Sequence, residues 1–175
     1  MDSFAPVCIF AYKRVDHLAH TVEMLSDNYL ADATDLIIFS DGAKDNSDIN
    51  NVDQVRNYSN KINGFKSVKL VKRDRNYGLS KNVITGVSEV LKTYNKVIVM
   101  EDDMETSPWF ISYMNEALQK YEFNNKVGCI HGYLYPEIDI EKPFFLRGAD
   151  CWGWATWRST WEKFNSNSFM LFSEL

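Results

Sequence analysis

Short apolar runs alternate with amphipathic stripes from Val7 to His131, and this alternation constrains the fold of the chain more than any other feature. The runs are typical of strands buried on both faces, and the stripes have the spacing of helices with one buried face. Such alternation predicts βαβ units, and therefore an α/β fold with a mostly parallel sheet and helices on both faces. We expect strands at 7–12, 36–39, 68–71, 97–100 and 127–131, and helices near 16–29, 49–62, 83–94 and 108–121.

The composition is that of one ordinary globular domain. The chain has 175 residues, of which 45% are hydrophobic and 25% charged. A formal charge of -5 without a long basic stripe argues against a nucleic-acid partner. Cys8, Cys129 and Cys151 lack a C-x-x-C spacing, so neither a disulfide framework nor a zinc site is indicated. With no signal peptide and no apolar stretch near the ~20 residues of a membrane span, we expect a cytoplasmic protein, at most peripheral to a membrane.

The chain changes character after Gly132. Pro136 and Pro143 bracket a predicted loop, and 144–147 could form a further strand. The spacing of Trp154, Trp157 and Trp161 predicts one face of a helix, preceded by a loop that holds Trp152 and Trp154. The last residues include the apolar segment 169–172 without a helix-stop signal, so we expect a domain cut before its end.

Polar side chains follow the first four predicted strands. Because the carboxyl ends of parallel strands meet at one edge, where open α/β sheets bind ligands, we expect these groups to form one site. The acids among them would repel one another unless a cation lay between them, and Mg²⁺ or Mn²⁺ prefers such oxygen ligands. A solvated acidic loop is the alternative for the acids alone. The groups are Tyr12-Lys13-Arg14, Ser40-Asp41-Gly42, Arg73 to Gly78 and Glu101-Asp102-Asp103.

Each of these groups has a plausible chemical use. Arg14 offers a planar fork to a phosphate or a base edge. Asp41 can accept a hydrogen bond from a nucleobase N–H or a ribose hydroxyl. Asn76 and Gly78 would let the backbone approach a ligand closely, and Lys81 adds positive charge near the start of the third predicted helix.

Taken together, four segments resemble a glycosyltransferase of the GT-A fold, over about residues 6–165. The first strand with Tyr12-Lys13-Arg14 is similar to the uridine-binding start of such domains, and Asp41 to their base-pairing aspartate. The run from Arg75 to Asn82 resembles the N-x-G-x-x-x-N segment of family 2 glycosyltransferases. The triplet 101–103 resembles the D-x-D metal motif, in the E-D-D form of N-acetylglucosaminyltransferase I.

The resemblance implies a single GT-A-type nucleotide-sugar-binding domain over 1–175, truncated at its C-terminus. Residues 1–133 would form the nucleotide-binding half, and 134–175 the start of the acceptor-binding part. The implied activity is metal-dependent hexosyl or N-acetylhexosaminyl transfer from a nucleotide-sugar donor, which we expect to be UDP-linked, to a glycan or other hydroxyl acceptor. By family association the product would be a bacterial surface polysaccharide.

The resemblance also assigns residues. Mn²⁺ or Mg²⁺ would bind Asp103 and stabilise the departing UDP. Trp152 or Trp154 would stack on the sugar or acceptor, while Trp157 and Trp161 serve packing. The donor-binding set is Tyr12, Arg14, Asp41, Asn76, Tyr77, Gly78, Glu101 and Asp102.

The catalytic base is not identified. Inverting members use a carboxylate further along the chain as general base, and after Trp161 only Glu162 and Glu174 remain, neither in a recognisable motif. Asp150 is a weak candidate, because Arg147 could simply be its ion-pair partner. We therefore expect the base to be encoded beyond Leu175.

The alternative is a non-catalytic nucleotide-sugar-binding domain that lacks the base. A sugar-nucleotide pyrophosphorylase would need a glycine-rich first loop, and residues 8–14 contain no glycine. A phosphatase with an aspartyl nucleophile would need an acid at the end of the first strand, where Tyr12 and Lys13 stand.

Overall fold

The computed structural model describes residues 4–133 and 144–167. The loop between Pro136 and Pro143 and the apolar segment 169–172 therefore lie outside the described residues. The elements are β1 (Val7–Ala11), α1 (Val15–Ser26), η1 (Ala31–Ala33), β2 (Asp35–Ser40), η2 (Asn46–Asp48), α2 (Ile49–Ser59), β3 (Ser67–Lys72), α3 (Leu79–Val90), β4 (Lys96–Glu101), α4 (Phe110–Tyr121), β5 (Ile130–His131), β6 (Trp154–Trp157) and α5 (Arg158–Trp161).

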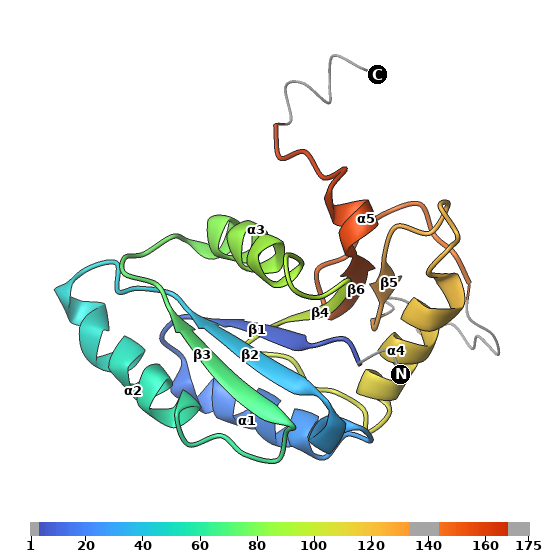
Figure 1. Ribbon diagram of the computed structural model, residues 1–175. Helices are drawn as coiled ribbons and strands as arrows, with labels where there is room; N and C mark the ends of the chain where they lie inside the picture. The colour runs from blue at the N-terminus through green and yellow to red at the C-terminus, as the bar shows by residue number, and fades with distance from the viewer. Residues whose placement is uncertain (1–3, 134–143, 168–175) are drawn as a thin grey trace.

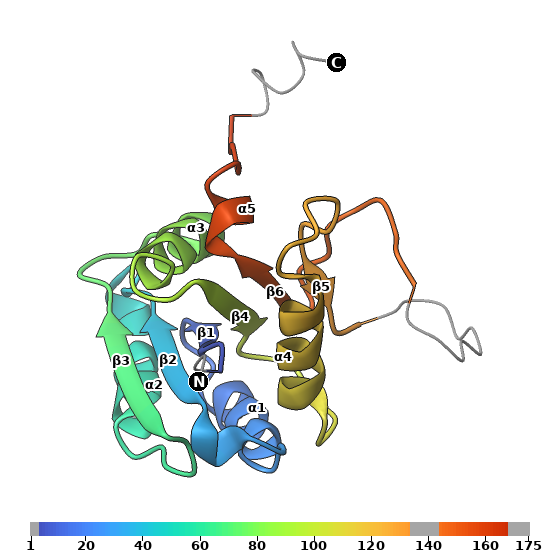
Figure 2. The ribbon, with the colours of Figure 1, turned by 45° about the vertical axis from the view of Figure 1, so that its right-hand side comes forward.

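The strands of the described residues form one sheet in the order β3-β2-β1-β4-β6-β5. The strands β1 to β4 are parallel to one another, β6 is antiparallel to β4, and β5 is antiparallel to β6. The helices α1 and α2 lie on one side of the sheet and α3 lies on the other (Figures 1 and 2). This arrangement confirms the predicted α/β class with a mostly parallel sheet.

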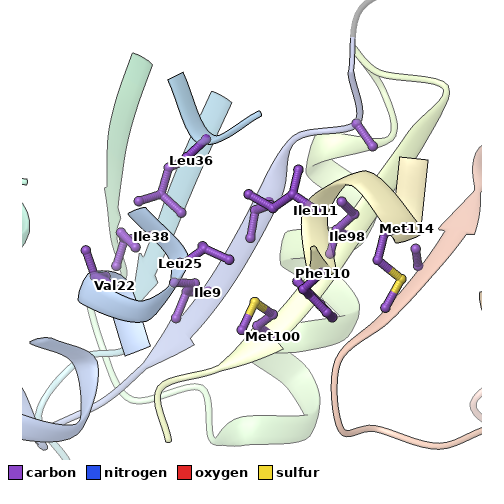
Figure 3. Close-up of a cluster of buried hydrophobic side chains, with 14 of the residues drawn as sticks. Ile9, Val22, Leu25, Leu36, Ile38, Ile98, Met100, Phe110, Ile111 and Met114 are labelled. Atoms are coloured by element: carbon purple, nitrogen blue, oxygen red, sulfur yellow. The ribbon is translucent and has the colours of Figure 1, made fainter. Parts of the chain in front are cut away.

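The alternation of side chains along β1 explains why both faces are covered. Ile9 faces the core beneath α1, α2 and α4, whereas Phe10 faces α3 and stacks on Phe39 of β2 with ring centroids 4.9 Å apart. Figure 3 shows Ile9, Ile38 and Ile98 of three neighbouring strands beneath side chains of α1 and α4. Each such buried side chain contributes about 1.5–3 kcal/mol to folding.

The segment after Gly132 differs from the prediction. The sequence 154–157 forms the strand β6 rather than the start of a helix, so Trp154 and Trp157 face opposite sides of the sheet. The predicted helical stripe of tryptophans is therefore wrong, because pairing with β4 and β5 outweighs the helix-like spacing. The predicted strand at 144–147 is also wrong, and the strand expected at 127–131 is limited to Ile130–His131.

The packing role predicted for Trp157 and Trp161 is confirmed. Trp157 is buried and its indole Nε1 donates a hydrogen bond to the Leu118 carbonyl of α4 at 3.1 Å. Trp161 stacks between Trp154 and Phe164. Among the described residues, no helix has the length and apolar character needed to cross a membrane.

Candidate functional site

Polar groups that follow four strands lie at the carboxyl edge of the parallel strands. β1, β2, β3 and β4 end there at Ala11, Ser40, Lys72 and Glu101, and the predicted site residues follow these ends. Trp154, the first residue of β6, lies opposite Val99, so the segment before β6 reaches the same edge. The topology therefore brings the predicted groups to one edge of the sheet.

Asp41 lies at the end of β2, and its carboxylate accepts three backbone hydrogen bonds. Oδ1 accepts from the amides of Gly42 and Tyr77 at 2.9 and 2.8 Å, and Oδ2 accepts from the Gly78 amide at 2.9 Å. Asp41 is only 4% exposed. Its carboxylate thus holds the loop after β3 against the end of β2, with one side of Oδ2 left to accept a further hydrogen bond.

The loop after β3 packs closely on Gly42. A Cβ placed on Gly42 would lie 2.3 Å from the carbonyl carbon of Arg75, so a side chain does not fit there. Asn76 reinforces this contact, because its Nδ2 donates to the Gly42 carbonyl at 2.8 Å. Gly78 has φ +74°, a left-handed conformation that favours glycine, and α3 begins immediately after it.

Positive side chains surround the ring of Tyr77. The guanidinium of Arg73 and the ammonium of Lys81 each lie 5.1 Å from the ring centroid, and the Arg75 guanidinium lies 5.9 Å from it. A surface hollow of about 550 Å³ lies beside this ring and is lined by Gly78, Lys81 and other residues at the start of α3. The edge therefore offers a cationic and aromatic surface at the loop between β3 and α3, which Asp41 holds in place and which is called the Asp41 loop below.

Arg56 of α2 joins the ends of β2 and β3, and the sequence did not identify it. Its guanidinium donates to the Ser40 hydroxyl at 3.2 Å, the Asp41 carbonyl at 3.4 Å and the Arg73 carbonyl at 2.8 Å. The one sequence feature that could have pointed to this role is the position of Arg56, a positively charged residue directly after Val55 on the apolar face of a predicted helix. Arg56 holds the two strand ends together.

Asp102 is buried at the centre of the acidic triplet. Its carboxylate accepts a hydrogen bond from Arg14, and its carbonyl accepts from the Thr21 hydroxyl of α1 at 3.0 Å. Burial raises the pKa of Asp102, opposed by the hydrogen bond and charge of Arg14. Thr21 also accepts from the Met104 amide at 3.0 Å, so α1 holds the acidic loop from both sides.

Glu101 and Asp103 flank Asp102 and are more exposed. The Asp103 side chain is 40% exposed, and its Oδ2 lies 2.9 Å from Nη2 of Arg14. Burial raises the pKa of Glu101, with further contributions from the negative charges of Asp103 and Asp102. Two of the three acids, Asp102 and Asp103, thus share the Arg14 guanidinium as their ion-pair partner.

The carboxylates of residues 101–103 suit a divalent cation that completes its coordination shell with oxygen atoms of a bound ligand. Among residues 4–133 and 144–167, no group of three or more His, Cys, Asp or Glu side chains is arranged to hold a metal ion. Mg²⁺ in nucleotide sites commonly takes only one or two carboxylates and completes its shell with substrate phosphates and water. The exposed carboxylate of Asp103 fits that mode of binding.

Tyr12 and Lys13 are held by Asp48, which the sequence did not identify. The Tyr12 hydroxyl donates to Oδ2 of Asp48 at 2.5 Å, and Nζ of Lys13 lies 2.7 Å from Oδ1. These hydrogen bonds lower the pKa of Asp48, Lys13 first and Tyr12 second. The Lys44 amide donates to the Tyr12 hydroxyl at 2.9 Å, so the loops after β1 and β2 are tied together.

Trp152 and Asp150 lie in the segment that enters β6. The exposed ring of Trp152 meets the Tyr133 ring edge-on, with centroids 4.8 Å apart. The Asp150 carboxylate accepts from the Trp152 amide at 3.1 Å, and the Asp150 amide donates to Nδ1 of His131 at 3.3 Å. In the described part of the chain no ion pair joins Asp150 to Arg147.

Trp154 is placed differently from Trp152. It belongs to β6 and stacks on Trp161 with ring centroids 5.8 Å apart, on the face of the sheet that carries α3. The prediction that Trp154 lies in a loop is wrong, and Trp152 is the more exposed ring of the two.

A comparison with one solved structure agrees with this fold. The mannosyltransferase PcManGT from Pyrobaculum calidifontis, solved in complex with GDP-Man and Mn²⁺, matches 73% of this chain with a TM-score of 0.51 and 14% identity. TarS from S. aureus matches 67% of the chain with a TM-score of 0.46 and 12% identity. The chain spans 35% and 20% of the lengths of these two proteins.

A search of curated proteins finds no match to the sequence. The family comparison is decisive, because the model of glycosyl transferase family 2 matches residues 7–168 and so includes every strand described above. The predicted GT-A fold class is confirmed by this match together with the sheet topology. The chain belongs to glycosyl transferase family 2.

Proposed function

We propose that this domain binds a nucleoside diphosphate sugar at the carboxyl edge of its sheet and serves the transfer of that sugar to a saccharide hydroxyl. The observation that carries the proposal is the meeting of Arg14, the Asp41 loop and the acidic triplet at one edge of a family 2 domain. This combination supplies oxygen ligands for a cation, a guanidinium for phosphate and a fixed loop for a nucleoside.

We infer that the base and ribose lie between the loops held by Asp41 and Asp48. Asp41 would contribute its remaining acceptor position and would fix the amides of Tyr77 and Gly78. Asn76 and Tyr12 belong to the same two loops. The resemblance of these residues to uridine-binding segments favours UDP, whereas the mannosyltransferase PcManGT was solved with GDP-Man. GDP is therefore the rival nucleotide in the test.

The acidic triplet would serve the diphosphate and the sugar. Asp103 is exposed and would hold Mn²⁺ or Mg²⁺ together with diphosphate oxygens. When bound, the cation stabilises the negative charge of the leaving nucleoside diphosphate. Glu101 and Asp102 would accept hydrogen bonds from ribose or sugar hydroxyls, and Arg14 would bring positive charge to the phosphates.

The acceptor would approach over the segment that precedes β6. Trp152 presents an exposed ring at this edge, and aromatic faces stack on sugar rings. Asp150 is the described carboxylate nearest in sequence to this ring and is the candidate base to test within the chain.

Calorimetry with UDP and GDP, each with Mn²⁺ and with EDTA, tests the donor site. We expect UDP to bind in the presence of Mn²⁺, and we expect Asp103→Asn or EDTA to weaken that binding. Equal affinity for UDP with Mn²⁺ and with EDTA would contradict the role of Asp103. Failure of both nucleotides to bind would contradict the proposal as a whole.

Transfer is tested by the release of UDP from UDP-sugars in the presence of candidate saccharide acceptors. A domain that binds UDP but does not transfer sugar, even as part of a longer chain, would be the non-catalytic binding domain considered above. Asp150→Asn tests whether the catalytic base is Asp150 or a residue beyond Leu175. If Asp150 is the base, the substitution should lower the transfer rate by about 10²–10⁴.

A further inference from the structure

Arg14 lies between Asp103, the proposed cation ligand, and the neighbouring acid Asp102. Its Nη2 contacts Oδ1 of the buried Asp102 and lies 2.9 Å from Oδ2 of the exposed Asp103. The side chain of Arg14 comes from the loop between β1 and α1 and is itself 45% exposed. One exposed guanidinium therefore bridges two acids that differ greatly in burial.

The neighbouring basic side chains of this region have other partners. Nζ of Lys13 binds Asp48, and His20 lies 3.0 Å from Glu105. Among the described residues, Arg14 is thus the cation that the ion pairs place on the acidic triplet. Its charge offsets part of the repulsion between the acids.

A divalent cation that approaches Asp103 would meet this guanidinium. Arg14 already donates to Oδ2, and a positive charge a few ångströms away repels a second one strongly at the edge of a protein. A diphosphate changes the balance, since its oxygens coordinate the cation and also accept from a guanidinium. Arg14 can then leave Asp103 without losing an anionic partner.

We propose that Arg14 is a resident counter-charge that a divalent cation displaces from Asp103, so that the cation binds together with the nucleotide and only weakly before it. The inference rests on the proposed function and deepens it, because it assigns the coupling between metal and nucleotide to one side chain. A guanidinium that only binds phosphate would have a different consequence: its removal would weaken nucleotide binding and leave the affinity for the metal alone unchanged.

The test is a titration with Mn²⁺ alone, followed by the electron paramagnetic resonance signal of the free ion. We expect Arg14→Gln to bind Mn²⁺ about tenfold more tightly than the wild type, because both the competing donor and its repulsion are gone. The matched control is Lys13→Gln, which makes the same change in net charge at the adjacent residue, whose partner is Asp48. Its affinity for Mn²⁺ should change by less than about twofold.

A second substitution locates the effect. Asp103→Asn in the Arg14→Gln background should abolish the gain in Mn²⁺ affinity. Arg14→Lys should give a smaller gain, since an ammonium point charge does not bridge two acids as a planar guanidinium does. Circular dichroism checks the fold, and if Arg14→Gln does not fold, Arg14→Lys alone decides the question.

An unchanged or weaker affinity of the Arg14 variants for Mn²⁺ would overturn the inference, as would a gain that survives Asp103→Asn. Calorimetry of the wild type with UDP and Mn²⁺ separates this result from failure of the proposed function. If UDP binds with Mn²⁺ and the Arg14 variants show no gain, only the role of Arg14 is wrong. If the wild type binds no nucleotide, the proposed function is wrong.

Discussion

At the scale of single residues, Asp41 holds a loop in place, in addition to the donor-binding role that we propose for it. Its carboxylate satisfies three backbone amides and is only 4% exposed. A side chain chosen only to contact a ligand would lie at an accessible strand end, as Asp103 does. The loop that carries Asn76 to Gly78 therefore depends on Asp41 before any ligand arrives.

We expect Asp41→Asn to lower the free energy of unfolding by about 1–3 kcal/mol, because an amide in place of the carboxylate leaves a buried backbone N–H without an acceptor. The midpoint of urea denaturation measures the change. Asp103→Asn is the matched control and should cost less than about 1 kcal/mol, since its pair with Arg14 is solvent-exposed. Equal losses in the two variants would contradict the structural role of Asp41.

At the scale of elements, the short helix η2 is tied to the loop after β1 through Asp48. Tyr12 and Lys13 both bind the Asp48 carboxylate and lower its pKa. A carboxylate whose pKa is lower in the folded state stabilises the fold above its unfolded pKa, about 3.9 for Asp, and loses that contribution as pH falls. This link is therefore sensitive to acid.

The prediction is that Asp48→Asn melts below the wild type at pH 7. The difference should shrink as the pH falls below about 3.9, because the unfolded wild-type chain then takes up a proton at Asp48 while the folded protein, in which the pKa of Asp48 is lowered, still holds the charge. Thermal unfolding between pH 7 and pH 3 measures it. A difference that stays constant over this range would mean that Asp48 acts through packing rather than through its charge.

The elements also show how far sequence reasoning reached. Strands β1, β2 and β4 were predicted because their runs are apolar on both faces, as parallel strands between helices require. The strand β6 was not, since Trp154, Trp157 and Trp161 have helical spacing and only the neighbouring strands β4 and β5 make the segment extended. Pairing between distant segments leaves no periodic signal in the segment itself.

At the scale of the whole molecule, topology alone predicted that the groups of the candidate site share one edge of the sheet. Parallel strands have to end on the same edge, so the polar groups after β1 to β4 had to meet. The bonds inside the site were not predictable in the same way. The three amides on Asp41 and the bridge of Arg14 to two acids depend on the conformations of loops, which no spacing in the sequence encodes.

The order of the strands has a further consequence for how the protein behaves in a crowded solution. An open sheet edge invites another chain to add a strand, and here one outer strand, β5, has only two residues. The other, β3, places Lys69 and Lys72 among its apolar residues, which makes such an addition costly. Replacing both lysines by valine should therefore promote self-association, measurable as a larger sedimentation coefficient, whereas replacing the exposed Lys61 and Lys92 outside the sheet should not. Among the described residues, the shortness of β5 and the lysines of β3 therefore both oppose strand addition at the outer strands of the sheet.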